Sequence, residues 1–589
     1  MKFEKFNRYL IILCLVIIFS ANICYNLVHI IKNELKLSWT LNPFSFILAL
    51  QDSHLLFGTV LLSCLFMLTI IKLDYDFILK RINKNEVPAS DGNLEYGSSR
   101  WLKDKEIKKH FKVWNFDSIS KGGIPVTFLN KKCYYDDSSD HYLVIGSTGS
   151  GKSVSLAIPL IFNLASAGES MVINDTKGEL YSYTYQFLKE HGYNIYILNL
   201  RDANSSDGWN PLHLPYQFYK SNNLDEAGDM IENFAKSLTK NLSSKDQYWE
   251  KSSNAVLSAL CYALMEDATS EEEINLYSIY NLLISHGSKY IERQNSLELY
   301  FQEKPAKSLS KMAFATGGFA KGETRATLFS VLATTIKMFS DVGIANLTSR
   351  TDFELGEIGE KKTAVFLIIP DEKLSRHELA SLFIDQCYQA LVFQAMKNGG
   401  ETKIRVNFLL DEFANMPAIN GMANKITVSR SRNIRFYLII QDFAQLKETY
   451  KEASSTIKAN TNWIYLLTSD NETAKELSTK LGRYTISTSR LSTSGRTNQS
   501  DWSLSHDNSL LGRELLMPEE LMRFHFGEGI IFKSRIFPIK STLLPINSYP
   551  FYIKKESLPI NERNFTIKCF DLDEYRFRNS NNYEDQAEL

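Results

Sequence analysis

Gly146-Ser147-Thr148-Gly149-Ser150-Gly151-Lys152-Ser153 is the stretch of sequence that decides the fold. It matches every fixed position of the phosphate-binding loop pattern GxxxxGK[ST]. Glycines let such a loop curl so that its backbone N–H groups point at phosphate oxygens. We expect all eight residues to bind a nucleotide. Lys152 is expected to reach the β- and γ-phosphates during catalysis, and the Ser153 hydroxyl is expected to bind Mg²⁺.

The residues on either side give the loop its structural context. Residues 141–145 (HYLVI) predict a buried strand entering the loop, and residues 154–165 predict an apolar helix leaving it. The N-terminus of that helix favours an anion, and Pro159 is expected to interrupt or kink it. The alternative is a Gly/Ser turn that matches the pattern by chance, and the strand, loop and helix together argue against it.

Length and composition set limits on the class of protein. A chain of 589 residues can form several domains with cores of their own. The formal net charge of −1 shows no overall basic character, so any surface for nucleic acid must be local. The 7 cysteines contain no CxxC pair, which excludes a disulfide framework or a zinc pattern and fits a reducing compartment.

Two apolar runs near the N-terminus, at about 10–31 and 55–71, predict membrane spans. Each approaches the roughly 20 residues that a bilayer-spanning helix needs. Basic residues flank their outer ends, so the positive-inside rule places both termini in the cytoplasm. A signal peptide is the alternative for the first run, but a second span follows and Ser20-Ala-Asn22 is a poor cleavage site. We expect residues 1–72 to anchor a multi-pass protein in the cytoplasmic (inner) membrane.

The fold class expected for the rest of the chain is α/β, with a RecA-like P-loop NTPase domain. Strands that alternate with helices predict a mostly parallel sheet covered on both faces. The predicted strands after the phosphate loop are residues 170–175, 193–199, 364–369, 406–410, 436–440 and 463–467. The domain is expected to comprise residues 73–219, which include a lead-in that packs on it, and residues 346–545.

Three further segments differ in character from this domain. Residues 220–345 show helical spacing without a clear strand, which predicts an all-helical inserted domain; crossover helices of the main domain are the alternative. Residues 484–510 are rich in Ser, Thr and Asn and predict an exposed loop or a hairpin of polar strands. Residues 546–589 are expected to be a C-terminal extension with a solvated acidic tail.

Asp411-Glu412, at the end of the predicted strand 406–410, is the second nucleotide signature. An acid at a strand end beside the phosphate loop can hold Mg²⁺, and the next acid can polarise a water for attack on a γ-phosphate. We expect ATP and Mg²⁺ as cofactors, Asp411 as a metal ligand and Glu412 as the catalytic base. The alternative is a pair of acids that caps the next helix.

Further polar residues follow neighbouring strands. Gln441 can sense the γ-phosphate or orient the water and is a third catalytic candidate; a plain strand-end amide is the alternative. Asp175, Lys177 and Glu179 are expected close to the nucleotide, as supporting or coupling residues without an assigned step.

Four basic residues lie between the two strand-end motifs, namely Lys425, Arg430, Arg432 and Arg435. One arginine could act on the nucleotide of a neighbouring subunit. The group could instead contact nucleic-acid phosphates in a channel. A solvated helix face is the third possibility.

These motifs together resemble the membrane-anchored coupling proteins of type IV secretion and conjugation systems, the TraG/TraD type, which are relatives of FtsK-like DNA pumps. The matching pieces occur in family order and are Tyr96–Trp101, Gly146–Ser153, Asp175–Glu179, Trp209–Leu212, Leu410–Phe413, Ser429–Arg432, Gln441–Gln445 and Arg513–Leu521. The resemblance implies a homo-hexameric ATPase that translocates DNA. The implied partners are single-stranded DNA with its relaxase, protein substrates or adaptors at the helical insert, and inner-membrane channel components.

Two other functions fit parts of the sequence. A receptor could dock secreted protein effectors at the channel without moving DNA. A chromosome-segregation pump of the FtsK kind is weakened by the two spans and by the lack of a recognisable C-terminal winged-helix module. Stimulation of ATP hydrolysis by DNA separates the translocase from the docking receptor.

Overall fold

A computed structural model of the protein describes residues 18–27, 57–64, 94–240, 247–291, 293–317, 323–370, 372–494, 503–560 and 566–578. The chain divides into two compact units, Met1–Asp91 and Gly92–Leu589. In the first unit, residues 18–27 and 57–64 are helical, and the remainder of both predicted spans lies outside the described residues. Within the described part of the chain, none of the helices combines the length and apolar character that crossing a bilayer demands.

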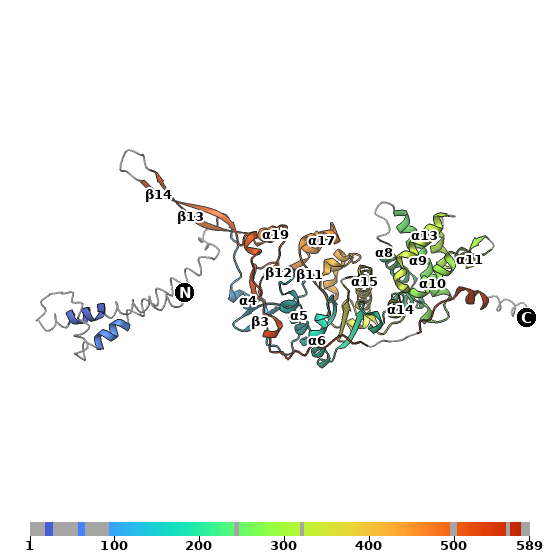
Figure 1. Cartoon of the computed structure of the whole chain (residues 1–589), viewed down its shortest axis with the longest axis horizontal. Helices are drawn as coiled ribbons and strands as arrows, with labels where there is room; N and C mark the ends of the chain where they lie inside the picture. The colour runs from blue at the N-terminus through green and yellow to red at the C-terminus, as the bar shows by residue number, and fades with distance from the viewer. Residues whose placement is uncertain are drawn as a thin grey trace, which may run out of the picture. The chain divides into compact units, whose positions relative to one another are not determined.

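A nine-stranded sheet forms the centre of the second unit (Figure 1), in the order β16-β15-β12-β4-β11-β10-β5-β9-β6. Its strands are β4 (His141–Gly146), β5 (Ser170–Asp175), β6 (Asn194–Asn199), β9 (Thr363–Ile368), β10 (Val406–Leu410), β11 (Ile434–Ile440), β12 (Thr461–Leu467), β15 (Glu528–Phe532) and β16 (Ile539–Thr542). The strands from β12 to β6 are parallel, and β15 and β16 are antiparallel. The predicted mostly parallel sheet is confirmed, with an antiparallel edge that the sequence analysis did not include.

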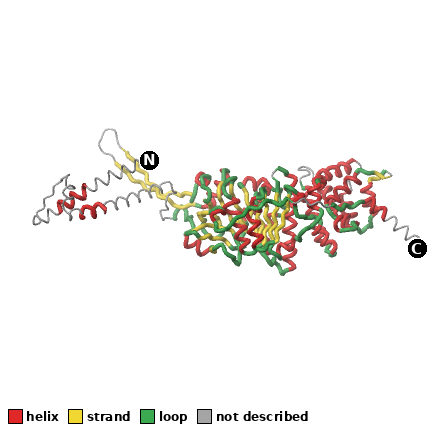
Figure 2. The backbone as a smooth tube through the Cα atoms, turned by 60° about the horizontal axis from the view of Figure 1, so that its bottom comes forward, coloured by secondary structure: helices red, strands yellow, loops and turns green. Residues whose placement is uncertain are grey.

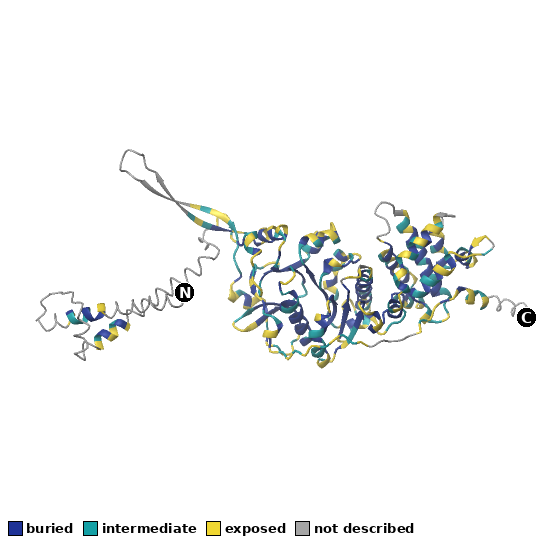
Figure 3. Ribbon diagram, viewed as in Figure 1, coloured by how far each residue is buried: buried dark blue, intermediate teal, exposed yellow. Residues whose placement is uncertain are grey.

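The interior strands are apolar because helices cover both faces of the sheet. Every residue of β4, β5, β9, β10 and β11 is buried (Figure 3). Such near-continuous apolar runs are typical of parallel strands covered on both sides. The helices of this α/β part are α5 (Ile158–Ser166), α6 (Glu179–Glu190), α15 (Leu374–Lys397), α16 (Met422–Val428), α17 (Phe443–Tyr450), α18 (Ala453–Ala459), α19 (Asn471–Leu481) and α20 (Pro518–Leu521).

The lead-in packs on the sheet, as predicted. It contains α4 (Asp104–His110) and a small antiparallel sheet of β1 (Lys112–Trp114), β3 (Lys132–Asp136) and β2 (Ile124–Leu129). Trp114 is fully buried in the same apolar core as Phe162 of α5. Phe551 contacts both, with ring centroids 5.5 Å from Trp114 and 4.8 Å from Phe162.

Residues 220–345, called here the helical segment, separate β6 from β9 and are mostly helical (Figure 2). Helix α7 (His213–Lys220) leads into it. Its helices are α8 (Leu224–Thr239), α9 (Gln247–Asp267), α10 (Leu276–Gly287), α11 (Ser296–Glu303), α12 (Leu309–Gly317) and α13 (Glu323–Thr335), and α14 (Val342–Thr348) leads out. The described strands of this segment are the two-residue pair β7 (Tyr290–Ile291) and β8 (Gln294–Asn295).

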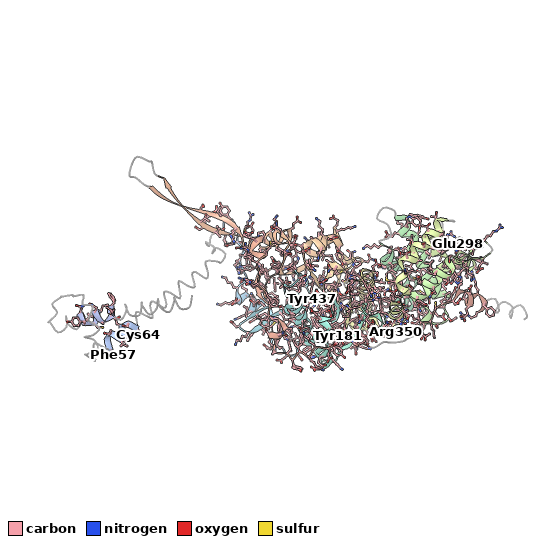
Figure 4. All side chains as sticks on the ribbon, viewed as in Figure 1. Phe57, Cys64, Tyr181, Glu298, Arg350 and Tyr437 are labelled. Carbon is pink, nitrogen blue, oxygen red and sulfur yellow. The ribbon has the colours of Figure 1, made fainter. Side chains whose placement is uncertain are left out.

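The entry and exit of the helical segment are fastened together. The Arg350 guanidinium donates to the Ser206 carbonyl at 2.8 Å, and the Asp352 carboxylate accepts from the Gly208 N–H at 2.7 Å. Arg350 thus lies at the base of the segment, whereas Glu298 lies on α11 farther from the sheet (Figure 4).

The structure tests the predictions for two peripheral segments, the polar stretch 484–510 and the C-terminal extension. The described residues of the stretch 484–510 belong to the paired strands β13 (Arg483–Ser494) and β14 (Ser503–Glu514), which project from the α/β part (Figures 1 and 2). Residues 566–578 pack on α10 rather than forming a solvated tail. Phe570 is 3% exposed and donates its N–H to Ser278 Oγ at 3.0 Å, and Lys289 pairs with Asp573 at 2.8 Å. Residues 579–589 lie outside the described residues.

Candidate nucleotide-binding site

Four adjacent parallel strands bring the predicted site residues to one edge of the sheet. In the order β4-β11-β10-β5, their carboxyl ends carry the phosphate loop, Gln441, Asp411-Glu412 and Asp175. Ligands of open parallel sheets bind outside the carboxyl ends of the strands. The sheet order therefore explains how motifs about 260 residues apart in the chain meet.

The phosphate loop is held in a shape that requires glycine. A Cβ on Gly146 would lie 2.6 Å from Ser150 Oγ and 2.8 Å from Lys152 Cγ. Gly149 and Gly151 have φ angles of 81° and 88°, in the left-handed region that glycine adopts without steric cost. The loop therefore wraps closely around its own backbone, as a phosphate cradle does.

The helix after the loop begins as a π-helix rather than an α-helix. Element η2 (Lys152–Ala157) is followed by α5, and the Ile158 N–H bonds the Ser153 carbonyl five residues earlier. Pro159, which lacks an N–H, occupies the first turn of α5. The predicted interruption at Pro159 is confirmed, because the helix changes from π to α hydrogen bonding just before the proline.

A cavity of about 270 Å³ opens at this edge of the sheet. Its lining residues are Ser147, Thr148, Gly149, Gly151, Lys152, Ser153, Val154, Asp175, Thr176, Lys177, Glu179, Leu180, Asp411, Glu412 and Phe526. It brings the phosphate loop together with both acids of the Asp-Glu pair. Asp175, Lys177 and Glu179 line the cavity directly, although we expected a supporting position. Phe526 was not predicted from the sequence.

Burial shifts the titration of three groups in the cavity. Desolvation lowers the pKa of Lys152, although Asp411 and Glu412 oppose that shift. Desolvation raises the pKa of Asp411 to about 6, against the opposing charge of Lys152, and raises that of Asp175 to about 6. A cation bound beside these carboxylates favours their ionised forms. The cavity is therefore suited to a ligand that brings both phosphate and positive charge.

Glu412 is held by a neighbouring amide and does not cap a helix through its side chain. Its backbone is left-handed (φ 51°), and the following turn, η7 (Phe413–Asn415), receives no capping hydrogen bond from its side chain. Asn415 Nδ2 instead donates to Glu412 Oε2 at 2.6 Å. The capping alternative thus lacks the bond it requires, and Glu412 stays a candidate base at the cavity wall.

The donor set fits a magnesium ion shared with phosphate. Ser153 and Asp411 both line the cavity. No group of three or more His, Cys, Asp and Glu side chains, among the described residues, is placed to hold a metal ion by itself. Mg²⁺ is usually held by one or two protein oxygens together with substrate phosphates and water. An ion held by Asp411 and Ser153 would neutralise the charge of the bound phosphates.

Asp175 lines the cavity, whereas Gln441 does not. Asp175 is 1% exposed, and its carboxylate accepts the backbone N–H groups of Gly178 and Tyr181, both at 2.8 Å. It therefore fixes the turn that forms one cavity wall. Gln441 is half-buried at the end of β11 and is not part of the cavity lining. Its catalytic role stays a prediction.

The basic residues between the motifs do not share one role. Arg435 is 1% exposed and donates to Glu169 at 2.5 Å, to Asn407 at 2.8 Å and to the Ser138 carbonyl at 2.8 Å. Lys425 pairs with buried Asp385 at 2.7 Å. These two residues stabilise the fold, so none of the three predicted roles applies to them.

Arg430 and Arg432 remain candidates for contact with a partner. The Arg430 side chain is 51% exposed and pairs with Asp140 at 3.1 Å. Arg432 is half-buried, and its guanidinium donates to the Val428 carbonyl at 3.4 Å.

The fold and the cavity define the class as an α/β protein of the P-loop type. The chain belongs to the family described as "Type IV secretory system Conjugative DNA transfer", whose model matches residues 89–546. The resemblance noted from the motifs is thereby confirmed.

Curated relatives agree with this family. The chain is 27% identical over 401 residues to a "Conjugal transfer protein TraG" of Escherichia coli, covering 65% of this chain and 61% of the relative. It is 23% identical over 408 residues to "Protein VirD4" of Rhizobium radiobacter, covering 66% and 55%. The chain thus matches about three fifths of the length of these relatives.

Solved structures show the same fold. The "Bacterial conjugative coupling protein TrwBdeltaN70" superposes with a TM-score of 0.57 at 18% identity, covering 80% of this chain and 98% of that one. TrwB in complex with the non-hydrolysable ATP analogue ADPNP gives a TM-score of 0.55 at 17% identity, covering 80% and 100%.

Proposed function

We propose that the chain is a coupling ATPase of a type IV secretion or conjugation system. It would recruit a relaxase with its single DNA strand and drive delivery of that strand to the transfer channel by ATP hydrolysis. The carrying observation is that Lys152, Asp411 and Glu412 line one cavity in a chain of the conjugative DNA transfer family. TrwB, which has a similar fold, has been solved with ADPNP and with ADP and Mg²⁺, which supports the choice of cofactors.

Each residue has a definite task in this proposal. Lys152 and the N–H groups of the phosphate loop bind the β- and γ-phosphates, and Ser153 and Asp411 hold Mg²⁺. The ion neutralises charge that develops on the phosphates. Glu412 accepts a proton from the attacking water, and Gln441 orients that water.

The proposal includes the assembly and its place in the cell. The apolar runs at about 10–31 and 55–71 support an inner-membrane anchor with both termini in the cytoplasm. The subunits form a homo-hexamer in which Arg430 or Arg432 reaches a neighbour's nucleotide. Residues 220–345 receive protein substrates or adaptors, and the anchor contacts inner-membrane channel components.

The test is the ATPase rate of the full chain with and without single-stranded DNA. We expect hydrolysis that DNA stimulates. Lys152→Ala should abolish turnover with membrane insertion intact. Glu412→Gln should bind ATP but hydrolyse it about a hundredfold more slowly, since general bases contribute at least this much. Parental rates in Glu412→Gln remove Glu412 from the role of base, and hydrolysis indifferent to DNA favours docking of protein effectors.

A further inference from the structure

An exposed aromatic ring lies directly against the phosphate loop. Phe526 is 58% exposed, and among the described residues that line the cavity it is the single aromatic side chain. It is so close to Gly151 that a Cβ added there would lie 2.8 Å from Phe526 Cε2. The ring therefore forms one wall of the cavity next to the phosphate cradle.

The loop that carries Phe526 is held at both ends. Phe524, two residues before, packs edge-on against Tyr465 of β12 with ring centroids 5.5 Å apart. His525 donates its N–H to Glu528 Oε2 at 3.0 Å, and the Gly527 carbonyl accepts from the Leu543 N–H at 2.8 Å. Leaving a large apolar ring in water forgoes favourable burial. A fixed loop that keeps this ring exposed at a cavity indicates a ligand that covers it.

The sheet order places the ring opposite the acids. Phe526 precedes β15, which lies two strands from β4 on one side, while Asp411 and Glu412 follow β10, two strands from β4 on the other. In a phosphate loop the lysine reaches the β- and γ-phosphates. A triphosphate whose γ end lies at Lys152 and Glu412 therefore directs its ribose and base toward the Phe526 side.

We propose that Phe526 stacks on the base of the bound nucleotide and is the residue that selects nucleotides over bare polyphosphates. This inference rests on the proposed function and deepens it. The phenyl ring has a π-face but no hydrogen-bonding group, so it stacks on adenine and guanine alike. The site therefore takes nucleoside triphosphates without reading the edge of the base.

The test measures the affinity of the full chain for ATP, GTP and inorganic tripolyphosphate by calorimetry. Phe526→Ala should weaken ATP and GTP about tenfold, as loss of one stacked base predicts, and leave tripolyphosphate unchanged. Phe526→Trp should retain ATP affinity. Phe537→Ala is the matched control, because Phe537 is also partly exposed (37%) but packs under Arg100, with 4.1 Å from the guanidinium to the ring centroid.

The outcomes separate this inference from the proposed function. Unchanged ATP affinity in Phe526→Ala overturns base stacking and leaves the ATPase proposal intact. An equal loss of tripolyphosphate affinity in Phe526→Ala also overturns base stacking, because the ring then affects binding only through the phosphate loop. A parental chain that binds no nucleotide overturns both. Since Phe526 is mostly exposed, its truncation should not unfold the chain.

Discussion

The side-chain amide of Asn415 donates a hydrogen bond to the Glu412 carboxylate, with 2.6 Å between Nδ2 and Oε2. Glu412 lines the nucleotide cavity, whereas Asn415 lines a larger cleft of about 940 Å³. That cleft lies between α8 of the helical segment and residues 414–424 of the α/β part, which include the start of α16. One hydrogen bond therefore joins the candidate base to a surface that the helical segment shares.

Removing this amide should raise basal hydrolysis. The hydrogen bond engages a carboxylate oxygen that an attacking water needs, so Asn415→Ala should increase kcat about fivefold with little change in KM, the scale of one hydrogen bond. Steady-state ATPase rates measure the effect. Asn420→Ala is the control, because Asn420 lines the same cleft and bonds Asn233 instead of Glu412. An unaltered kcat in Asn415→Ala contradicts the prediction.

Two glycines of the phosphate loop should tolerate alanine differently. Gly146→Ala forces a Cβ within 2.8 Å of Ser150 Oγ and Lys152 Cγ, so it should abolish ATP binding. Gly149→Ala meets no atom within 4 Å and bears only the cost of the left-handed backbone, about 1–2 kcal/mol. Nucleotide titrations of both variants measure the difference. Equal losses would mean that backbone conformation alone, and not the close packing at Gly146, governs the loop.

The buried pair of Arg435 and Glu169 should matter for stability. Arg435→Met leaves Glu169 buried without its closest partner, which typically costs about 3–5 kcal/mol. Thermal unfolding of the full chain measures this loss. Arg430→Ala should leave the unfolding temperature nearly unchanged, because the Arg430 side chain is 51% exposed. A stable Arg435→Met chain contradicts the structural role.

Acid should destabilise the chain through His141. Burial, with Arg430 nearby, lowers the pKa of His141 to about 4, below its unfolded value of 6.5. The unfolded state thus binds the extra proton first, and stability present above pH 6.5 is lost as pH falls toward 4. The loss in the free energy of unfolding approaches about 3 kcal/mol.

The His141→Gln variant separates the contribution of His141 to stability from that of groups with the opposite pH dependence. Asp175 and Asp411, whose pKa values burial raises, contribute stability that is lost as pH rises through about 6. They titrate equally in both proteins, so the difference between parent and His141→Gln reports on His141. Unfolding free energies from pH 4 to 7 measure it. Identical slopes for the two proteins contradict the assignment.

The sequence predicted the part of the fold that local pattern controls. Strands such as Ser170–Asp175 and Val406–Leu410 are short, fully buried runs with an apolar centre, and the structure has them with the same bounds. The antiparallel edge was missed because β15 (EGIIF) and β16 (IKST) are short and lack helices between them. Their pairing depends on tertiary contacts with β12 rather than on periodicity.

The candidate site was predictable where a motif carries the chemistry. Gly146–Ser153 and Asp411-Glu412 meet because parallel strands align their ends, which follows from the pattern. Phe526 carries no motif, and its contact with Gly151 follows only from the placement of β15. Arg435 and Arg430 look alike in sequence, and only the burial of β11 distinguishes an internal ion pair from a surface charge.

The C-terminal stretch has a mechanical consequence. Leu558 packs against Gly178 at the wall of the nucleotide cavity, and about a dozen residues later Phe570 is buried on α10. A dozen residues reach at most about 40 Å. The covalent length of this stretch therefore sets an upper limit on the separation of its two attachment points, one beside the turn that Asp175 holds and the other on α10.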